Sequence, residues 1–265
     1  MRYRIRAAVG VIATTALALF LIGCGGGSTQ STARAVPNPN TPPANATVIS
    51  NIQNESGWSN CSATIGDNFP CASGKGDAVA WMAQNQTTPS VSGASAEFHL
   101  GGPVGYSNNL WWKNLDPNSS ASHFDYDFWI LTPDPSLPQA LEFDVNQSFG
   151  GTRWVFGTEC NLDGNGLWDV WDASGKVGQW VPTQLGCPHL TPNTWAHFVW
   201  HFERAGDQVH YISLTVNDTN YSVDMYEAAQ QNWNDDGLTV AVQLDGNAEQ
   251  QPYSVFVDKL SLIYW

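Results

Sequence analysis

The chain has 265 residues, of which 42% are hydrophobic and 13% charged, and its 24 acidic residues against 10 basic ones give a net charge of −14. A surface this acidic repels the phosphates of nucleic acid and the headgroups of anionic lipids. The charge therefore excludes nucleic acid as a partner and disfavours polyanionic polysaccharides. The length suits one large all-β domain behind an N-terminal leader, with enough residues for a substantial core.

The first 23 residues have the pattern of a bacterial export signal. Three arginines, Arg2, Arg4 and Arg6, precede an almost uncharged apolar run over residues 7–22, which is too short to span a membrane comfortably. The run ends in "LIGC", which resembles the lipobox of bacterial lipoproteins, in which cleavage exposes the cysteine and its sulfur is lipidated. We therefore expect a signal peptide over residues 1–23, lipidation of Cys24, and membrane association through the lipid alone.

Residues 24–47 are rich in Gly, Ser, Thr, Pro and Asn and have almost no large apolar side chains, so they predict a flexible lipidated tether. Gly25 stands where an Asp would resemble an inner-membrane retention signal, which favours the outer membrane. The folded domain is expected over residues 48–265, and the protein is expected to be exported and anchored to the cell envelope.

Beyond the tether, short segments with period-two alternation follow one another, separated by Gly, Asn, Asp and Pro. The predicted strands are Thr47 to Gln53, Ala78 to Met82, Ser95 to Leu100, Asn109 to Lys113, His123 to Leu131, Ala140 to Gln147, Thr152 to Thr158, Leu167 to Asp172, Gln179 to Thr183, Thr194 to Arg204, Gln208 to Val216, Thr219 to Asp224, Leu238 to Leu244 and Ser254 to Trp265. So many strands exceed one open sheet and predict two sheets packed face to face. Residues 225–233 are expected to form a short helix or a turn.

Two segments show which side chains should fill the core. In both segments every second side chain is apolar. In "HFDYDFWIL" these side chains are Phe124, Tyr126, Phe128 and Ile130, and in "TWAHFVWHFER" they are Ala196, Phe198, Trp200 and Phe202. We expect both sets to face inward. His197 and His201 would lie roughly 13 Å apart on a strand, too far to share one metal ion.

With Cys24 assigned to the lipid, four cysteines remain in an oxidising compartment, where an even number predicts disulfides. Of the three possible connectivities, we favour Cys61 with Cys71 and Cys160 with Cys187, because each pair brackets a loop that closure would stabilise. No CxxC spacing is present, which disfavours zinc.

The order of the strands "NTWAHFVWHFE", "VNDTNYSV" and "YSVFVDKLSLIYW", together with the motif "LEFDV", resembles the concanavalin A-like lectin and glucanase superfamily. The resemblance implies an all-β jelly-roll sandwich of two curved antiparallel sheets. In glycoside hydrolase family 16 the corresponding strand carries a nucleophilic Glu, an orienting Asp and a Glu that is the general acid, and Glu142 and Asp144 match the first two positions.

The third position of that motif does not match. It falls on Asn146, or on Gln147 if the strand is bulged, and neither amide can transfer a proton at neutral pH. Retaining glycosidases need two carboxyl groups about 5 Å apart. The strand is therefore not competent for cleavage unless Glu159 or another distant carboxyl group replaces the missing acid.

The sequence gives little support for a metal or another cofactor. Legume-type lectins follow their "EFD" strand with further metal ligands, but the segment "NQSFGGTRWVFGTE" has no Asp or His. Asp163, Asn165 and Asp169 form a partial calcium loop without the Glu that such a loop needs at its twelfth position, and a Gly-rich turn explains them equally well. We expect no cofactor.

Thirteen tryptophans are a large number for one domain, and exposed indole faces can stack on sugar rings. We expect non-catalytic carbohydrate binding on the concave face, with Glu142, Asp144 and Gln147 hydrogen-bonding to the sugar and Trp154 or Trp129 stacking on it. The alternatives are a retaining endo-glycosidase with Glu142 as nucleophile, with Asp144 orienting it and a relocated acid, and a structural or adhesive envelope protein. The adhesive alternative is favoured if Glu142 and Asp144 are salt-bridged and covered.

Overall fold

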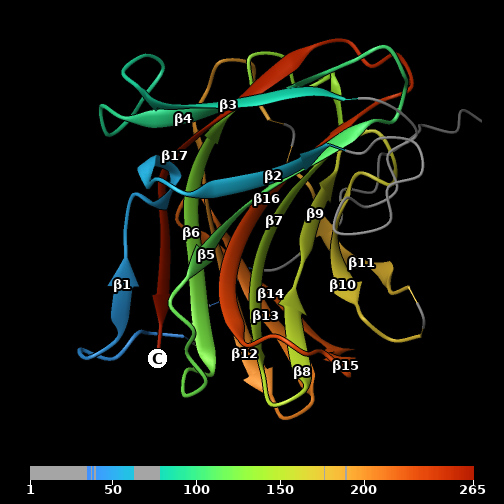
Figure 1. Ribbon diagram of the computed structural model, residues 1–265. Coiled ribbons are helices and arrows are strands. Elements are labelled where there is room, and N and C mark those ends of the chain that lie inside the picture. The colour runs from blue at the N-terminus through green and yellow to red at the C-terminus, as the bar shows by residue number, and fades with distance from the viewer. Residues whose placement is uncertain (1–34, 37, 39, 63–77, 176, 189) are drawn as a thin grey trace, which may run out of the picture. The chain divides into compact units, whose positions relative to one another are not determined.

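The computed structural model describes residues 35–36, 38, 40–62, 78–175, 177–188 and 190–265, and within them nearly all regular structure is β-strand. All strand pairs are antiparallel, and they form two sheets packed against each other (Figure 1). The one helical element described is a 3-10 turn, η1 (Ile52–Asn54). None of the described residues form a helix long and apolar enough to cross a membrane. The chain is thus an all-β jelly-roll sandwich of two antiparallel sheets, as predicted.

Sheet A has eight strands, with β1 paired to β17 beside the main order β14-β13-β12-β6-β17-β4-β3. Its strands are β1 (Thr47–Ile49), β3 (Val79–Gln86), β4 (Ser95–Gly101), β6 (His123–Leu131), β12 (Ala196–Ala205), β13 (Gln208–Val216), β14 (Thr219–Ala228) and β17 (Tyr253–Tyr264).

Sheet B has nine strands in the order β11-β10-β9-β7-β16-β5-β2, with β8 paired to both β7 and β15. Its strands are β2 (Trp58–Ser62), β5 (Asn108–Leu115), β7 (Pro138–Phe149), β8 (Thr152–Phe156), β9 (Thr158–Asn161), β10 (Leu167–Asp172), β11 (Gln179–Gly186), β15 (Gln230–Gln231) and β16 (Gly237–Gly246). The central pair β7 and β16 joins segments almost 100 residues apart in the chain.

The core lies between the two sheets and is rich in aromatic rings. Phe128 of β6 in sheet A stacks on Phe143 of β7 in sheet B, with ring centroids 4.2 Å apart. The inward sets predicted for the segments 123–131 and 195–204 are confirmed, except that Ala196 is only partly buried at the start of its strand. Since Phe143 and Val145 point into this core, the pleat turns Glu142 and Asp144 to the opposite face of sheet B.

Three predicted elements were wrong. Residues 225–233 form no helix, because β14 continues to Ala228 and β15 follows. The strand expected over Thr47 to Gln53 stops at Ile49 and is followed by η1, where Asn51 adopts a left-handed conformation with φ 57°. The strand expected over Thr152 to Thr158 is two strands, β8 and β9, and β9 continues to Asn161. Strand β2 was missed.

The predicted disulfide between Cys160 and Cys187 is confirmed, with Cα atoms 5.3 Å apart and a sequence separation of 27 residues. It ties β9 to the chain just after β11. The other predicted pair includes Cys71, which lies outside the described residues, as do the signal peptide and Cys24.

Part of the segment expected to be a tether contacts the sandwich. Ala35 forms a β-bridge with Tyr221, and the Val36 N–H donates to the Asn220 carbonyl at 2.9 Å. The side-chain nitrogen of Asn38, Nδ2, lies 3.3 Å from His201 Nε2.

Candidate functional site

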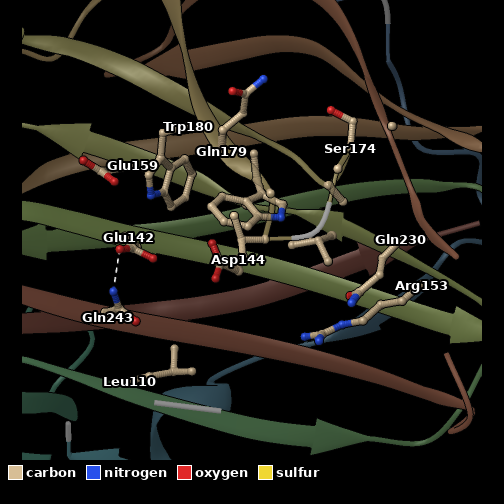
Figure 2. Close-up of a pocket in the computed structure, with 18 of the residues that line it drawn as sticks. Leu110, Glu142, Asp144, Arg153, Glu159, Ser174, Gln179, Trp180, Gln230 and Gln243 are labelled. Atoms are coloured by element: carbon tan, nitrogen blue, oxygen red, sulfur yellow. Dashed lines mark hydrogen bonds between the residues drawn. The ribbon is translucent and has the colours of Figure 1, made fainter. Parts of the chain in front are cut away.

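A row of polar side chains crosses the middle of sheet B on the face away from the core. Register places Gln243 of β16 opposite Glu142 of β7, Glu142 opposite Glu159 of β9, and Glu159 opposite Asp169 of β10. Directly paired residues in an antiparallel sheet have their Cβ atoms about 4.5–5.5 Å apart. Four strands therefore bring three carboxyl groups and an amide together, as Figure 2 shows for Glu142, Glu159 and Gln243.

Glu142 is held in place by its neighbours on β16. The Gln243 side-chain N–H donates to Glu142 Oε1, and it also lies 3.1 Å from Asp245 Oδ1. Only 8% of Glu142 is exposed. In the described part of the chain, neither Glu142 nor Asp144 forms an ion pair within 4 Å of a basic side chain. The carboxyl groups of the row therefore stand close together without a cation to neutralise them.

Burial, more than crowding, makes these carboxyl groups weak acids. Burial, reinforced by the charges of Asp245, Asp144 and Glu159, raises the pKa of Glu142 well above its usual value. Burial, with the charges of Asp245, Asp169 and Asp144, raises the pKa of Glu159 to about 8. Burial likewise raises the pKa of Asp245 to about 6. Burial first, and then the charges of adjacent carboxylates, therefore favour the protonated forms of Glu142 and Glu159 at neutral pH.

Asp144 lies two residues after Glu142 on β7 and on the same face, beside two tryptophans. The Thr158 N–H donates to Asp144 Oδ1 at 3.2 Å, and burial raises the pKa of this carboxyl to about 7, against the opposing effects of that hydrogen bond and the Arg153 charge. Trp171 and Trp180, paired across β10 and β11, meet edge to face with centroids 5.1 Å apart.

Gly157 lets these groups approach one another. A Cβ at this position would lie 2.9 Å from Trp171 Cβ, 3.4 Å from Asp144 Oδ1 and 3.5 Å from the Trp180 ring. The missing side chain therefore lets both tryptophans and Asp144 border the same space.

That space is a cavity of about 1340 Å³ on the outer face of sheet B. Its walls combine the carboxyl row and the two tryptophans with many neutral amides, and the amide side chains are Asn108, Gln139, Asn161, Gln179, Gln230, Gln231, Asn232 and Gln243. The lining also includes Arg153, whose guanidinium carbon lies 4.5 Å from the Trp233 ring centroid. Figure 2 shows Glu142, Asp144 and Glu159 toward one side of the cavity and Gln230 and Arg153 toward the other.

Three of the predicted ligand-binding residues are not in this cavity. Gln147 faces the opposite way from Glu142, is fully buried, and donates to the carbonyls of Asn118 at 2.7 Å and Ala121 at 2.9 Å. Trp154, its partner across β8, is buried against Phe149 and donates to the Gly206 carbonyl.

Trp129 is on sheet A, where it stacks on His197 with centroids 4.7 Å apart. Of the five ligand-binding residues predicted from the sequence, the structure thus places Glu142 and Asp144 in the cavity.

The polar side chains of the partial calcium loop form hydrogen bonds within the loop. The Asn165 side-chain N–H donates to both Asp169 oxygens at 2.8 and 3.0 Å, and its oxygen accepts the Leu167 N–H. Asn165 therefore turns its donor rather than its oxygen toward Asp169. Among the residues with described positions, no cluster of three or more His, Cys, Asp or Glu side chains could hold a metal ion.

Sequence reasoning missed most of the cavity. Gln243 and Asp245 alternate with buried Val242 and Leu244 in "VQLDG", a period-two signal that could have marked them as outward-facing. Glu159 was named only as a remote substitute for the missing acid. Its place opposite Glu142 follows from the hairpin turn at Gly150 and Gly151, because the register of β8 on β7 continues unchanged into β9.

No known protein family matches this chain, and no curated protein matches its sequence. Solved structures similar to it include a carbohydrate esterase from the Shiga toxin-encoding bacteriophage phi24B, with 14% identity and a TM-score of 0.44 over 83% of this chain and 99% of that one. A PL-14 alginate lyase from Aplysia kurodai is 8% identical, with a TM-score of 0.49 over 71% and 90% of the two chains. A family 11 carbohydrate-binding module from Clostridium thermocellum, in complex with a β-1,3-1,4-mixed-linked tetrasaccharide, is 10% identical, with a TM-score of 0.39 over 82% and 94%. Likenesses this distant give this chain neither a ligand nor an activity.

Proposed function

We propose that this protein binds a neutral polysaccharide in the cavity on the outer face of sheet B. The observation that carries the proposal is the placement of Trp171 and Trp180 beside a row of carboxyl and amide side chains in one large open cavity. Indole rings provide apolar surface for the C–H faces of sugars, and the polar row provides donors and acceptors for their hydroxyl groups.

The charge of the cavity supports a neutral ligand rather than a uronate polymer. Glu142, Asp144, Glu159 and Asp245 line it together, and Arg153 is the one basic side chain among its described lining residues. A carboxylate on the ligand would be repelled by this cluster at close range. A neutral chain avoids that repulsion and can still accept hydrogen bonds from the protonated carboxyl groups.

The test is binding of the purified protein to laminarin, lichenan and agarose, with alginate as the anionic comparison, by affinity electrophoresis and calorimetry. We expect retardation by at least one neutral polymer and none by alginate. Trp180→Ala should weaken binding about tenfold, since the loss of about 1.4 kcal/mol, within reach of one aromatic contact, is a factor of ten.

The matched control is Trp81→Ala, which removes an indole that is 42% exposed on β3 of sheet A. This variant should bind as the unaltered protein does. Failure of every neutral polymer to retard the protein, or an equal loss in both tryptophan variants, would overturn the proposal.

The open cavity weighs against a purely adhesive role, because Glu142 and Asp144 line it and are not locked in ion pairs. We further propose, from the sequence, that the protein is exported and anchored by lipid on Cys24 to the cell envelope, at the outer membrane. Mass spectrometry of the mature N-terminus should find a lipidated cysteine. Cys24→Ala should move the protein from the membrane fraction to the soluble one, and an unchanged distribution would contradict the anchor.

A further inference from the structure

We propose that the glycan that this cavity binds most tightly carries free amino groups, so that an amino sugar is preferred to the same sugar in its N-acetylated form. The inference rests on the proposed function and deepens it, since it assigns a substituent to the polysaccharide bound on the outer face of sheet B. A neutral chain binds there, and an ammonium group on the chain adds an attraction that the neutral chain lacks.

The first argument is that the carboxyl groups of the cavity lack a counter-charge. Four of them line it, from Glu142, Asp144, Glu159 and Asp245. In the described part of the chain, none of the four forms an ion pair with a basic side chain within 4 Å. Arg153, the one basic residue among the described lining residues, has its guanidinium over the Trp233 ring. The cation that this site lacks can therefore come from a ligand.

The second argument is a buried acceptor that has no partner. Asp245 is 8% exposed and lines the cavity, and its Oδ2 atom has no hydrogen-bond partner within the described residues. The other oxygen, Oδ1, lies 3.1 Å from the side-chain nitrogen of Gln243. A buried acceptor without a donor is unfavourable, and a donor on a ligand removes that cost. An ammonium group offers three donors together with a positive charge.

The third argument is that the two tryptophans border the same space as the carboxyl groups. Asp144 Oδ1 and the Trp180 ring lie 3.4 and 3.5 Å from one point above Gly157, where a Cβ atom would be. Trp171 meets Trp180 edge to face at 5.1 Å. A cation within about 6 Å of an indole ring is attracted by its face. A charged amine beside Asp144 can thus contact both a carboxylate and an indole, while its sugar ring packs on the remaining apolar surface.

The spread of the carboxyl groups suits an ammonium group better than a metal ion. A calcium or magnesium ion needs about six or more oxygens around one point at about 2.0–2.6 Å. Among the residues that the structure describes, no cluster of three or more His, Cys, Asp or Glu side chains meets that need. An ammonium group needs only one or two carboxylates, at about 2.7–2.9 Å. A row of carboxyl groups distributed over β7, β9 and β16 can provide these.

The preference for an amine should depend on pH. The charged or titratable groups around the site are the carboxyl groups of Glu142, Asp144, Glu159, Asp169 and Asp245, the guanidinium of Arg153 and the phenol of Tyr106. Burial raises the pKa of Asp245 to about 6 and that of Asp144 to about 7, so both hold protons at pH 4. An ammonium group stabilises their ionised forms, which lowers both pKa values and releases protons on binding. The preference should therefore grow from pH 4 to pH 6.

The test compares matched amine and acetamide probes by calorimetry. One pair is the hexamer of β-1,4-linked glucosamine with its N-acetylated form, and the other is 6-amino-6-deoxy laminarin with its N-acetylated form. At pH 6 the amine form of at least one pair should bind about tenfold more tightly, as expected of hydrogen bonds between charged groups. At pH 4 the two forms should bind within about threefold of each other. At pH 5.5, titrations in two buffers of different ionisation enthalpy should show protons released by the amine form alone.

Asp144→Asn and Asp245→Asn each remove one charge and keep the shape of the side chain. Each variant should lose at least three times more affinity for the amine form than for the N-acetylated form, with urea unfolding as the check that it is folded. Asp116→Asn is the same substitution at an exposed residue outside the cavity and should keep the full preference. Equal losses in all three variants would mean that the amine is attracted by the acidic surface as a whole, which contradicts the inference.

The remaining outcomes separate the inference from the function on which it rests. An amine probe that binds no more tightly than its N-acetylated form, or that fails to bind while a neutral polysaccharide binds, overturns the inference and leaves the binding function standing. Absence of binding by every probe and every neutral polysaccharide defeats the binding function itself, and the inference with it.

Discussion

The buried carboxyl row should make the stability of the fold depend on pH, and Glu159 shows by how much. Its pKa is about 8 in the fold against a usual 4.5, chiefly because of burial and then the charges of Asp245, Asp169 and Asp144. A raised carboxyl pKa means that the folded state binds more protons than the unfolded one between these two values. Stability is therefore greatest below pH 4.5 for this group and is lost as the pH rises toward 8.

The size of the effect follows from the two pKa values. Each pH unit inside this window costs up to about 1.4 kcal/mol for each such group, so Glu159 alone should cost about 2–3 kcal/mol between pH 5 and pH 7. Glu159→Gln removes this titration. The variant should therefore lose less stability than the unaltered protein over the same range.

The assay is urea unfolding followed by tryptophan fluorescence at pH 5, 6, 7 and 8. The free energy of unfolding of Glu159→Gln, relative to the unaltered protein, should increase by about 2–3 kcal/mol from pH 5 to pH 7. Asp116→Asn, at an exposed site, should follow the unaltered protein throughout. Parallel curves for Glu159→Gln and the unaltered protein would refute the reasoning, because they would mean that Glu159 titrates alike in both states.

Two further changes test the walls of the cavity. Gly157→Ala places a methyl group 2.9 Å from Trp171 Cβ, so it should lower the free energy of unfolding in urea by about 1–3 kcal/mol and weaken polysaccharide binding. The control is Gly186→Ala, which has nothing within 4 Å of the new methyl group and should change neither quantity. Equal effects of the two substitutions would contradict the packing argument. Cys187→Ser opens the bridge to Cys160, and the separation of 27 residues predicts a loss of about 3.5 kcal/mol, measured as a lower Tm; an unaltered Tm would show that the bridge contributes nothing.

Local pattern was sufficient for the architecture. Alternation fixed which side chains of segments 123–131 and 195–204 face the core, since the pleat of a strand leaves only two choices. The same rule placed Glu142 and Asp144 together on one face of β7. The prediction failed for Gln147, three residues after Asp144, which is on the opposite face because an odd number of steps separates it from both carboxyl residues.

The composition of the candidate site depended on which strands became neighbours. Gln243 and Asp245 lie about 100 residues from Glu142 in the chain. Glu159 is nearer in the chain and reaches Glu142 because β9 continues the register on β7 that the β7–β8 hairpin sets. Trp171 and Trp180 join them from a third pair of strands. Single-strand periodicity tells which face a side chain occupies, but partner and register result from long-range pairing, core packing and loop closure over the whole domain. For that reason the amino-acid pattern alone yielded two packed sheets and the shared face of Glu142 and Asp144, and only the folded sandwich brought Gln243, Asp245 and the two tryptophans to that face.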